Sequence, residues 1–340
     1  MYKKRKLKKK SIYLLIGIII FIILIITGIC LFKHFTSNEY KLLKQGYNEK
    51  EISTILKLDK KYINYALENK YDNDLIPLTK EKWFIWKNYS SYKKYIKTIE
   101  AQPSKKVDYS DIVTKINTKT NYKYYTHTSE TNMDLKNGIL VNKYYKLPEK
   151  YAPTDIVNIP STYAFGSNQI RKEVLDAFIE MHDAALKDNI TLIINSGYRT
   201  YEYQKNIYDS YEKSNGKEYA DSYAARPDFS EHQSGLALDI VSYGMTMQNF
   251  AQSDTYKWLV NNCYKYGFIL RYPENKEKIT GYKYESWHYR YLGKNLAKKV
   301  VNSGLTFDEY YAYYLNKEWF YEEIFTNNTD YNYHCYSLSR

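Results

Sequence analysis

The stretch Ser230-Glu-His-Gln-Ser-Gly-Leu-Ala-Leu-Asp239 leads from a polar loop into an apolar segment, and Glu285-Ser-Trp-His288 follows it further along the chain. Residues 236–241 have the composition of a buried strand, in which successive side chains alternate between two faces. One face carries Leu236, Leu238 and Ile240, and the other carries Ala237, Asp239 and Val241. A carboxylate in so apolar a strand costs free energy unless a cation accompanies it. The pattern therefore predicts a cation beside Asp239.

Three side chains of the kinds that bind Zn²⁺ lie in these two stretches: His232, Asp239 and His288. Two imidazoles and one carboxylate fill three positions of a tetrahedral Zn²⁺ and leave the fourth for water. Glu285 is a candidate to take the proton of that water. A lone histidine or aspartate beside an apolar strand usually has an ordinary structural role, but the combination predicts a catalytic site with one Zn²⁺ and a metallopeptidase.

The spacing of Glu285 and His288 sets a geometric condition on this prediction. Residues three apart in a regular strand point to opposite faces. If His288 binds the metal and Glu285 reaches the bound water, Glu285 must lie on a bend or loop that leads into a strand over 287–292.

The complete pattern resembles that of a known family. Ser230-x-His232-x-x-Gly235-x-Ala237-x-Asp239, with Glu285-x-Trp287-His288 downstream, resembles the signature of the LAS metallopeptidases. The surrounding sequence is similar to the VanY-type D-alanyl-D-alanine carboxypeptidase branch over about residues 139–305. The further matching stretches are Leu140-Val-Asn-Lys143, Ser196-Gly-Tyr-Arg-Thr200, Gln204 and Ser230-Glu-His-Gln233. One departure is Asp228, in a loop where such chains often carry Pro-Gly, but aspartate tolerates turn conformations.

This resemblance implies a role for each matching residue. The implied zinc ligands are His232, Asp239 and His288, and the implied catalytic base is Glu285. Arg199 would contact the substrate or the developing oxyanion, while Gln204 and Ser230 would help to hold the C-terminal end of the peptide. Chemistry supports the role of Arg199, because a guanidinium binds a terminal carboxylate through two charge-assisted hydrogen bonds.

The function expected from this resemblance is removal of the terminal D-alanine from peptidoglycan stem peptides by a zinc-dependent D-alanyl-D-alanine carboxypeptidase. Three alternatives remain open: an LD-carboxypeptidase acting on tetrapeptide stems, a peptidoglycan endopeptidase, and a non-catalytic peptidoglycan-binding module. The ligand set is common to the enzymes, whereas a binding module has no need for the base Glu285.

The N-terminal sequence predicts a membrane anchor. Residues 1–10 contain seven basic residues and no acidic residue, and an uncharged apolar run of about twenty residues follows within 11–32. The bias of basic residues toward the cytoplasm predicts a single-pass protein of the cell membrane, with 1–10 cytoplasmic and the catalytic domain extracytoplasmic. The formal net charge is +12, so the seven basic residues of the tail leave +5 for the rest, which argues against a nucleic-acid partner.

The remaining segments complete the predicted organisation. Asn48-x-x-Glu51 has the pattern of a helix-capping box, and 33–104 is predicted as a helical stalk or module. Residues 105–136 are predicted as connecting strands and loops, 137–316 as the zinc carboxypeptidase domain, and 317–340 as a tyrosine-rich tail. The sequence leaves the oligomeric state open.

The catalytic domain is predicted to be α+β, with a small antiparallel sheet that carries the zinc site and is flanked by helices. The predicted strands are 190–194, 236–241, 267–271 and 287–292. The predicted helices are 170–185, 201–211, 254–266, 294–302 and a final tyrosine-rich helix that a Thr306-x-x-Glu309 capping box opens. Cys263, which only Cys335 could pair with outside the membrane, is predicted to be a buried free thiol.

Overall fold

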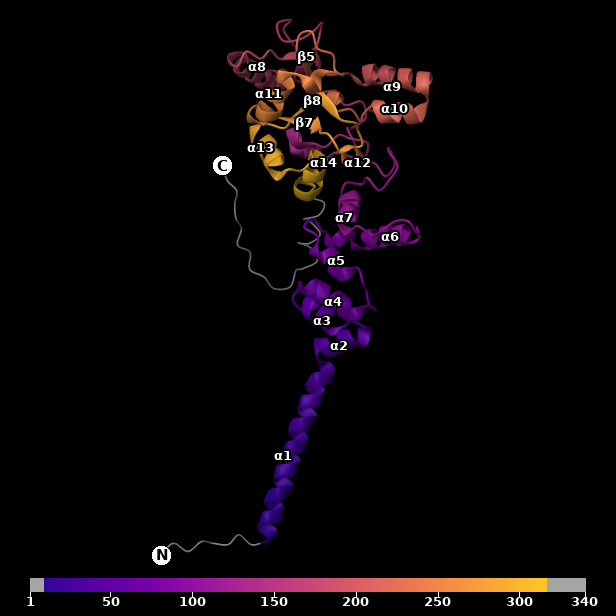
Figure 1. Cartoon of the computed structure of the whole chain (residues 1–340), viewed down its shortest axis with the longest axis vertical. Coiled ribbons are helices and arrows are strands. Elements are labelled where there is room, and N and C mark those ends of the chain that lie inside the picture. The colour runs from indigo at the N-terminus through magenta and orange to yellow at the C-terminus, as the bar shows by residue number, and fades with distance from the viewer. Residues whose placement is uncertain (1–8, 317–340) are drawn as a thin grey trace, which may run out of the picture. The chain divides into compact units, whose positions relative to one another are not determined.

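The chain divides into two units, Met1–Phe84 and Ile85–Arg340. The computed structural model describes residues 9–316 (Figure 1). The predicted tail 317–340, which includes Cys335, and all but the last two residues of the predicted basic tail 1–10 lie outside this range. The boundary after Phe84 falls within the segment 33–104 that the sequence predicts as one helical region.

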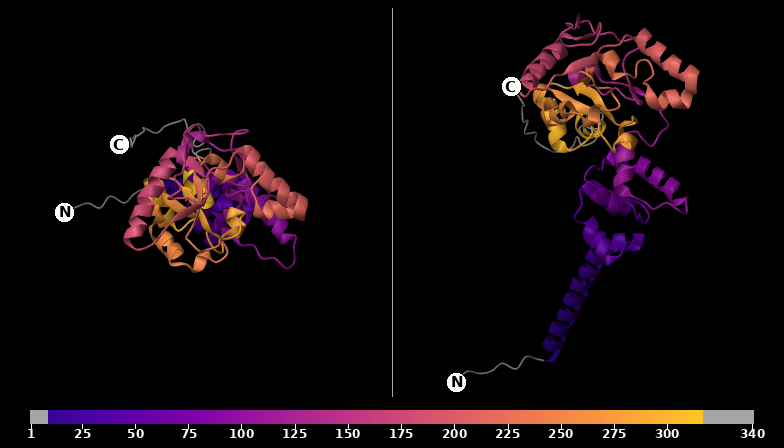
Figure 2. Two further views of the ribbon diagram at one scale, coloured as in Figure 1. Left: turned by 90° about the horizontal axis from the view of Figure 1, so that it is seen from above. Right: turned by 45° about the horizontal axis from the view of Figure 1, so that its top comes forward.

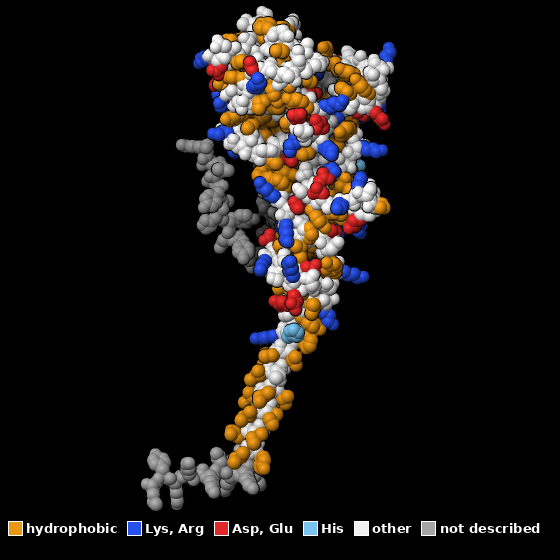
Figure 3. Space-filling view, viewed as in Figure 1, with side chains coloured by type: hydrophobic (Ala, Val, Ile, Leu, Met, Phe, Trp, Pro, Cys, Tyr) orange, Lys and Arg blue, Asp and Glu red, His pale blue; other side chains and the backbone are white. Residues whose placement is uncertain are grey.

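The first unit begins with the helix α1 (Lys9–Thr36). Its residues Ile12–Thr36 are long and apolar enough to cross a membrane, with a mean hydropathy of 3.3 in an 18-residue window. Hydrophobic side chains cover α1 on the face shown in Figure 3. By length and composition, α1 has the property of a membrane anchor or a signal sequence.

Four short helices complete the first unit: α2 (Asn38–Gln45), α3 (Glu49–Ile55), α4 (Lys60–Glu68) and α5 (Leu75–Lys80). The predicted capping box at the start of α3 is confirmed. The Glu51 amide donates to Asn48 Oδ1 at 3.0 Å, and the Asn48 amide donates to Glu51 Oε2 at 2.8 Å. These bonds satisfy backbone donors that a helix N-terminus otherwise leaves unpaired.

The second unit opens with a short 3-10 helix η1 (Trp86–Asn88), then α6 (Tyr89–Glu100) and α7 (Tyr109–Asn117). The helix α7 corrects the expectation that 105–136 contains only strands and loops. Its start is fixed by Asp108, whose Oδ1 accepts from the Asp111 amide at 3.1 Å. Ile112 and Val113 are buried on one side of it. This helical pattern is short and lies in a stretch rich in lysine and tyrosine, which obscured it.

A four-stranded antiparallel sheet lies at the centre of the second unit, as the sequence predicts. Its order is β5-β6-β8-β7, and its strands are β5 (Ile193–Ser196), β6 (Ala237–Val241), β7 (Phe268–Tyr272) and β8 (Glu285–Tyr291). Two smaller pairs accompany it, the parallel β1 (Ser129–Glu130) with β2 (Tyr145–Lys146) and the antiparallel β3 (Ile156–Asn158) with β4 (Gln169–Arg171).

Helices surround this sheet, and those that begin at residues 172, 201, 254, 294 and 307 match the predicted helices, whereas the two over 217–223 and 277–280 were not predicted. They are α8 (Lys172–Lys187), α9 (Tyr201–Asn215), α10 (Lys217–Tyr223), α11 (Asp254–Asn262), α12 (Glu277–Thr280), α13 (Lys294–Ser303) and α14 (Phe307–Tyr310). The short 3-10 helices are η2 (Met133–Gly138), η3 (Glu231–Ser234), η4 (Phe250–Gln252) and η5 (Cys263–Tyr266), and a π-helical turn η6 (Tyr311–Leu315) follows α14. The helices α9 and α10 lie side by side as a hairpin (Figure 2).

The two faces of the sheet have different environments. Leu238 and Ile240 of β6 belong to the main hydrophobic core, together with Phe178 of α8 and Leu259 of α11. Cys263 lies in the same core, which agrees with the predicted buried thiol. Burial raises its pKa to about 12. The apolar core therefore fixes one face of the sheet, and the opposite face is left for polar side chains.

Candidate active site

Strand register brings Asp239 and His288 together. In the antiparallel pair β6–β8 they are direct cross-strand partners, so their side chains lie on the same face. Ser196 of β5 lies opposite Asp239 from the other side. The ladder between β5 and β6 shifts by one residue at Asn195, so Ser196 and Ile194 point to opposite faces although they are two residues apart. Polar residues of three neighbouring strands therefore line up across the sheet.

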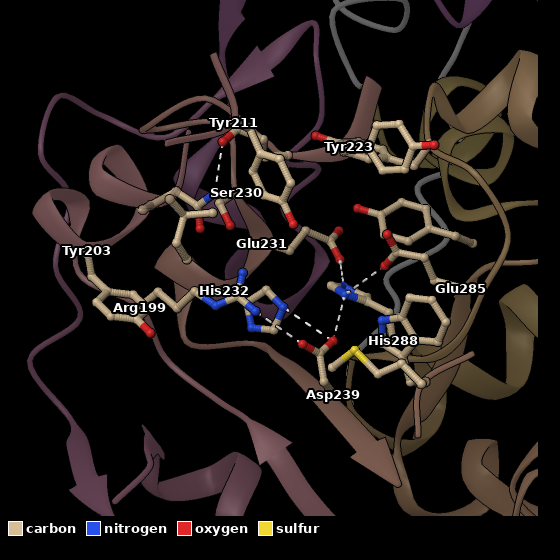
Figure 4. Close-up of a pocket in the computed structure, with 18 of the residues that line it drawn as sticks. Arg199, Tyr203, Tyr211, Tyr223, Ser230, Glu231, His232, Asp239, Glu285 and His288 are labelled. Carbon is tan, nitrogen blue, oxygen red and sulfur yellow. Dashed lines mark hydrogen bonds and ion pairs between the residues drawn. The ribbon is translucent and has the colours of Figure 1, made fainter. Parts of the chain in front are cut away.

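His232 reaches this row from the 3-10 helix η3, just before β6. Its Nε2 lies 3.4 Å from Asp239 Oδ1, and His288 Nδ1 lies 3.3 Å from the same oxygen. One ligand atom from each of the three residues lies within 4.8 Å of the other two, and all three residues are buried (Figure 4). The structure thus brings together the three predicted zinc ligands.

An acceptor behind each imidazole ring determines which nitrogen faces Asp239. His232 Nδ1 donates to the Gly197 carbonyl at 2.7 Å, because a carbonyl oxygen can only accept. His288 Nε2 lies 3.2 Å from Glu231 Oε2. His232 therefore presents Nε2, and His288 presents Nδ1, to the shared space beside Asp239.

This space fits a metal ion. Asp239 Oδ1 is buried and accepts no hydrogen bond from the described residues. Burial alone would raise the pKa of Asp239, but the nearby His232, His288 and Arg199 lower it well below its usual range. Burial likewise lowers the pKa of His288, while Asp239 and Glu231 raise it to about 9. Two imidazole nitrogens and one carboxylate oxygen thus converge in this buried space, and they form a donor set suited to Zn²⁺.

Glu285 lines the same cleft as His288, although the reason differs from the one expected. It is the first residue of β8 and does not lie on a bend or loop before the strand. The β7–β8 ladder is irregular here: Tyr289 pairs with Leu270 and Glu285 with Tyr272, so three residues of β8 face one residue of β7. Simple alternation fails across this bulge, and Glu285 Oε2 lies 3.6 Å from His288 Nδ1. Burial is the main cause that raises the pKa of Glu285, to about 7.

Arg199 follows β5 and lies just before Thr200, the N-cap of α9. Its Nε and Nη2 donate to Ser196 Oγ at 3.1 and 2.9 Å, and Nη2 also donates to Asp239 Oδ2 at 3.1 Å. The side chain is 21% exposed. Arg199 is therefore held in place by the row of polar residues and still borders the cleft.

The two other predicted residues border the cleft as well. Gln204 of α9 donates through Nε2 to the Ala225 carbonyl at 2.8 Å, and its buried Oε1 accepts no hydrogen bond from the described residues. Ser230 is buried immediately before η3. Asp228 adopts the left-handed conformation (φ 65°), which confirms that an aspartate maintains this loop. All seven predicted site residues line one cleft of about 660 Å³.

Sequence reasoning gave no role to Glu231, Arg271 and Arg290, which lie behind His288. Both arginines are fully buried and donate to Glu231 Oε1, at 2.8 Å from Arg271 Nε and 2.7 Å from Arg290 Nη1. A signal was available, because Arg271 lies in a strand of otherwise apolar and aromatic residues and Arg290 lies between two tyrosines, where a buried charge requires a partner.

Comparison with known proteins places this site in a family. The sequence profile of VanY, described as D-alanyl-D-alanine carboxypeptidase, matches residues 167–294. The putative carboxypeptidase YodJ of Bacillus subtilis (strain 168) is 45% identical over 179 residues, which make up 51% of this chain and 66%, just under two thirds, of that protein. VanXYC of Enterococcus gallinarum, a bifunctional D-Ala-D-Ala dipeptidase and D-Ala-D-Ala carboxypeptidase, is 33% identical over 51% of this chain and 93% of its own length.

Among solved structures, the LdcB LD-carboxypeptidase superposes with a TM-score of 0.53 and 41% sequence identity. The superposition covers 56% of this chain and 92% of LdcB, whose structure is described as revealing the molecular basis of peptidoglycan recognition. The segment that matches the VanY profile contains all seven residues of the cleft named above. The chain belongs to the VanY family of D-alanyl-D-alanine carboxypeptidases.

Proposed function

We propose that this chain is a zinc-dependent D-alanyl-D-alanine carboxypeptidase that removes the terminal D-alanine from peptidoglycan stem peptides. The observation that carries the proposal is the convergence of His232 Nε2, Asp239 Oδ1 and His288 Nδ1 in a cleft that also contains Glu285 and Arg199. Membership of the VanY family supports the reaction class.

In the proposed mechanism, His232, Asp239 and His288 would hold Zn²⁺, which would act there as a Lewis acid toward water and the scissile carbonyl. Glu285 takes the proton of the attacking water and then donates it to the leaving amine. A carboxylate with a pKa of about 7 is suited to both transfers near neutral pH, since it is easily protonated and deprotonated there.

Arg199 binds the terminal carboxylate of the peptide or the oxyanion that develops during attack, because its guanidinium is cationic and borders the cleft. Gln204 and Ser230 orient the C-terminal end of the peptide. Gln204 Oε1 supports this role, because it is buried and accepts no hydrogen bond from the described residues. A substrate N–H that donates to it would remove the free-energy cost of burying an unpaired acceptor.

One specific observation favours a second candidate, an LD-carboxypeptidase that acts on tetrapeptide stems. The solved LD-carboxypeptidase LdcB is 41% identical to this chain over 92% of its own length. The proposed ligands and base serve either reaction, so the two candidates differ in how the cleft accepts the residues next to the scissile bond.

The test incubates the purified protein with Zn²⁺ and with either pentapeptide or tetrapeptide stems, while released D-alanine is measured. Release from pentapeptide alone, abolished by a chelator and restored by Zn²⁺, is the expected result. Release from tetrapeptide alone would replace the proposal with the LD-carboxypeptidase. Release that a chelator leaves unchanged would refute the zinc mechanism.

We assign catalysis to residues 137–316 and propose that the span 11–32 anchors the chain in the cell membrane. The basic tail 1–10 would then be cytoplasmic and the catalytic domain extracytoplasmic. Segments 33–104 and 105–136 would connect the anchor to the enzyme. The apolar helix α1 supports the anchor by its length and composition.

A further inference from the structure

A buried carboxylate behind His288 has no part in the mechanism above. Glu231 lies in η3, next to the ligand His232, and its side chain has no exposed surface. Its Oε2 lies 3.2 Å from His288 Nε2. The other ring nitrogen, His288 Nδ1, faces Asp239 and Glu285 at 3.3 and 3.6 Å. Glu231 therefore contacts the edge of the imidazole that faces away from the metal position.

Two buried arginines hold Glu231 in this place. Arg271 of β7 and Arg290 of β8 both donate to Oε1 of Glu231, which leaves Oε2 for His288. Arg290 is fixed in turn by the carbonyls of Asn137 and Ile139, at 3.0 and 2.7 Å. Charge-assisted bonds of this kind are short and directional, so the carboxylate has little freedom to move.

The far end of the network is closed by a second acid. Asp308 accepts from Arg271 through both carboxylate oxygens, at 2.5 and 3.2 Å, and from Asn142 Nδ2 at 2.8 Å. Asp308 is buried like Glu231, but its hydrogen bonds within the described part of the chain go to Arg271 and Asn142 and not to His288. Two arginines and two carboxylates balance in charge, which permits all four to be buried.

We propose that Glu231 is a positioning residue, which fixes the ring of His288 and keeps an N–H on Nε2 so that Nδ1 is presented to the metal. The inference rests on the metal site of the proposed function and adds to it a residue that touches neither substrate nor metal. A carboxylate can only accept, so it selects one tautomer of the neutral imidazole and increases its basicity as a ligand. Gly197 performs the corresponding task for His232.

The competing explanation is that Glu231 only balances the charge of the buried arginines. Asp308 provides a matched control, because it pairs with Arg271 at the same depth without reaching His288. Under a purely structural role, Glu231→Gln and Asp308→Asn should both reduce stability. The two variants should then have similar affinities for Zn²⁺. Under a positioning role, only Glu231→Gln should weaken metal binding specifically.

The experiment measures the Zn²⁺ dissociation constant of the full-length protein in detergent by competition with a chromophoric chelator. Thermal unfolding of the metal-free protein is followed in parallel. We expect Glu231→Gln to weaken Zn²⁺ binding roughly 10- to 100-fold, as outer partners of metal ligands typically do. Asp308→Asn should stay close to the wild-type affinity. Equal affinities for wild type and Glu231→Gln, or equal losses in both variants, would overturn the inference.

A second variant keeps the test decisive if Glu231→Gln does not fold. Glu231→Asp retains the charge that the arginines require but is one methylene shorter, so it should fold and still bind Zn²⁺ more weakly than wild type. A wild-type affinity in this variant would count against the inference. Failure of the proposed function is recognised separately, because the wild-type protein itself would then bind no Zn²⁺ or release no D-alanine.

Discussion

The central residue of the site is Asp239, whose two oxygens have different surroundings. Oδ2 accepts from Arg199 Nη2 at 3.1 Å, while Oδ1 has only the two imidazole nitrogens beside it. One side of the carboxylate is thus saturated by a fixed cation, and the other remains available. Such a division orients the carboxylate before any metal arrives, which lowers the entropy lost on binding.

Substitution of Asp239 by asparagine tests this arrangement directly. Asp239→Asn keeps the volume but removes the charge that compensates a divalent cation in a buried site. We expect Zn²⁺ affinity to fall by at least roughly 100-fold, more than outer partners contribute, and D-alanine release to fall with it. The control is Asp209→Asn, which removes an exposed carboxylate paired with Lys205 on α9. Unchanged Zn²⁺ affinity in Asp239→Asn would exclude it as a ligand.

Arg199 allows a second test at this scale. Arg199→Lys retains a cation but loses the planar arrangement of donors that serves Ser196, Asp239 and a carboxylate together. The expected result is a roughly 10- to 100-fold lower kcat/KM, equivalent to about 1.4–2.7 kcal/mol, the size expected for hydrogen bonds to a charged group. Arg171→Lys, which alters a partly exposed pair with Asp155, is the matched control. A similar loss in both variants would indicate general destabilisation.

Lys143 gives a test of stability against pH. Its side chain is buried, and burial lowers its pKa from 10.5 to about 8. The unfolded chain therefore binds more protons than the folded chain between pH 8 and 10.5, so this lysine makes stability rise with pH across that window. The measurement is the free energy of unfolding in urea of the wild type minus that of Lys143→Met. This difference should rise by roughly 3 kcal/mol between pH 8 and 10.5. A difference that does not change with pH would show that the folded-state pKa is normal.

At the level of elements, the loop between β5 and α9 connects the backbone to the metal position. Gly197 lies in this loop, and its carbonyl accepts from His232 Nδ1. A Cβ at Gly197 would lie 2.3 Å from the Gln169 carbonyl oxygen, closer than real Cβ atoms approach a backbone atom. The close approach of β4 to this loop thus requires glycine.

Gly197→Ala should therefore displace the loop and the carbonyl that holds His232. We expect Zn²⁺ affinity to fall roughly tenfold, as for other outer partners, and stability to fall by about 1–3 kcal/mol through overpacking. Gly216→Ala is the control, since its φ of +85° imposes strain while no atom lies within 4 Å of the new Cβ. The control should lose about 1–3 kcal/mol of stability and no Zn²⁺ affinity. Equal Zn²⁺ affinities in both variants would show that the loop does not position His232.

The strands that carry the ligands could be predicted from the sequence because apolar alternation is a local property. This alternation predicts a strand over 236–241, and the local spacing Thr306-x-x-Glu309 predicts a helix-capping box. Both are present, the strand as β6 and the box at the start of α14. The bulge that brings Glu285 beside His288 could not be predicted, since it depends on how β7 pairs with β8. Glu231 was missed for the same reason: its partners Arg271 and Arg290 are 40 and 59 residues away.

At the scale of the whole molecule, every residue of the proposed site belongs to the second unit. That unit has its own hydrophobic core around α8 and the four-stranded sheet. A core of its own is what allows a part of a chain to fold alone. The first unit contributes the apolar helix α1 and has no residue in the cleft.

A chain that lacks residues 1–84 should therefore keep its kcat for D-alanine release from soluble stem peptides, within about twofold, because no cleft residue is removed. The same truncation should abolish recovery of the protein with the membrane fraction, since it removes α1. The measurements are turnover of the purified fragment and fractionation of cells. A folded fragment without turnover would show that the first unit takes part in the reaction.

The irregular ladder between β7 and β8 has a consequence for protein engineering. A continuous ladder would pair every residue of β8, but residues three apart would then face opposite sides, and Glu285 could not share a cleft with His288. Deleting two residues of the bulge would restore regular pairing and remove the site in the same step. A sequence redesigned on this backbone for thermal stability alone would tend to make this ladder regular. Substitutions in β8 should therefore be the first that raise stability while they lower turnover.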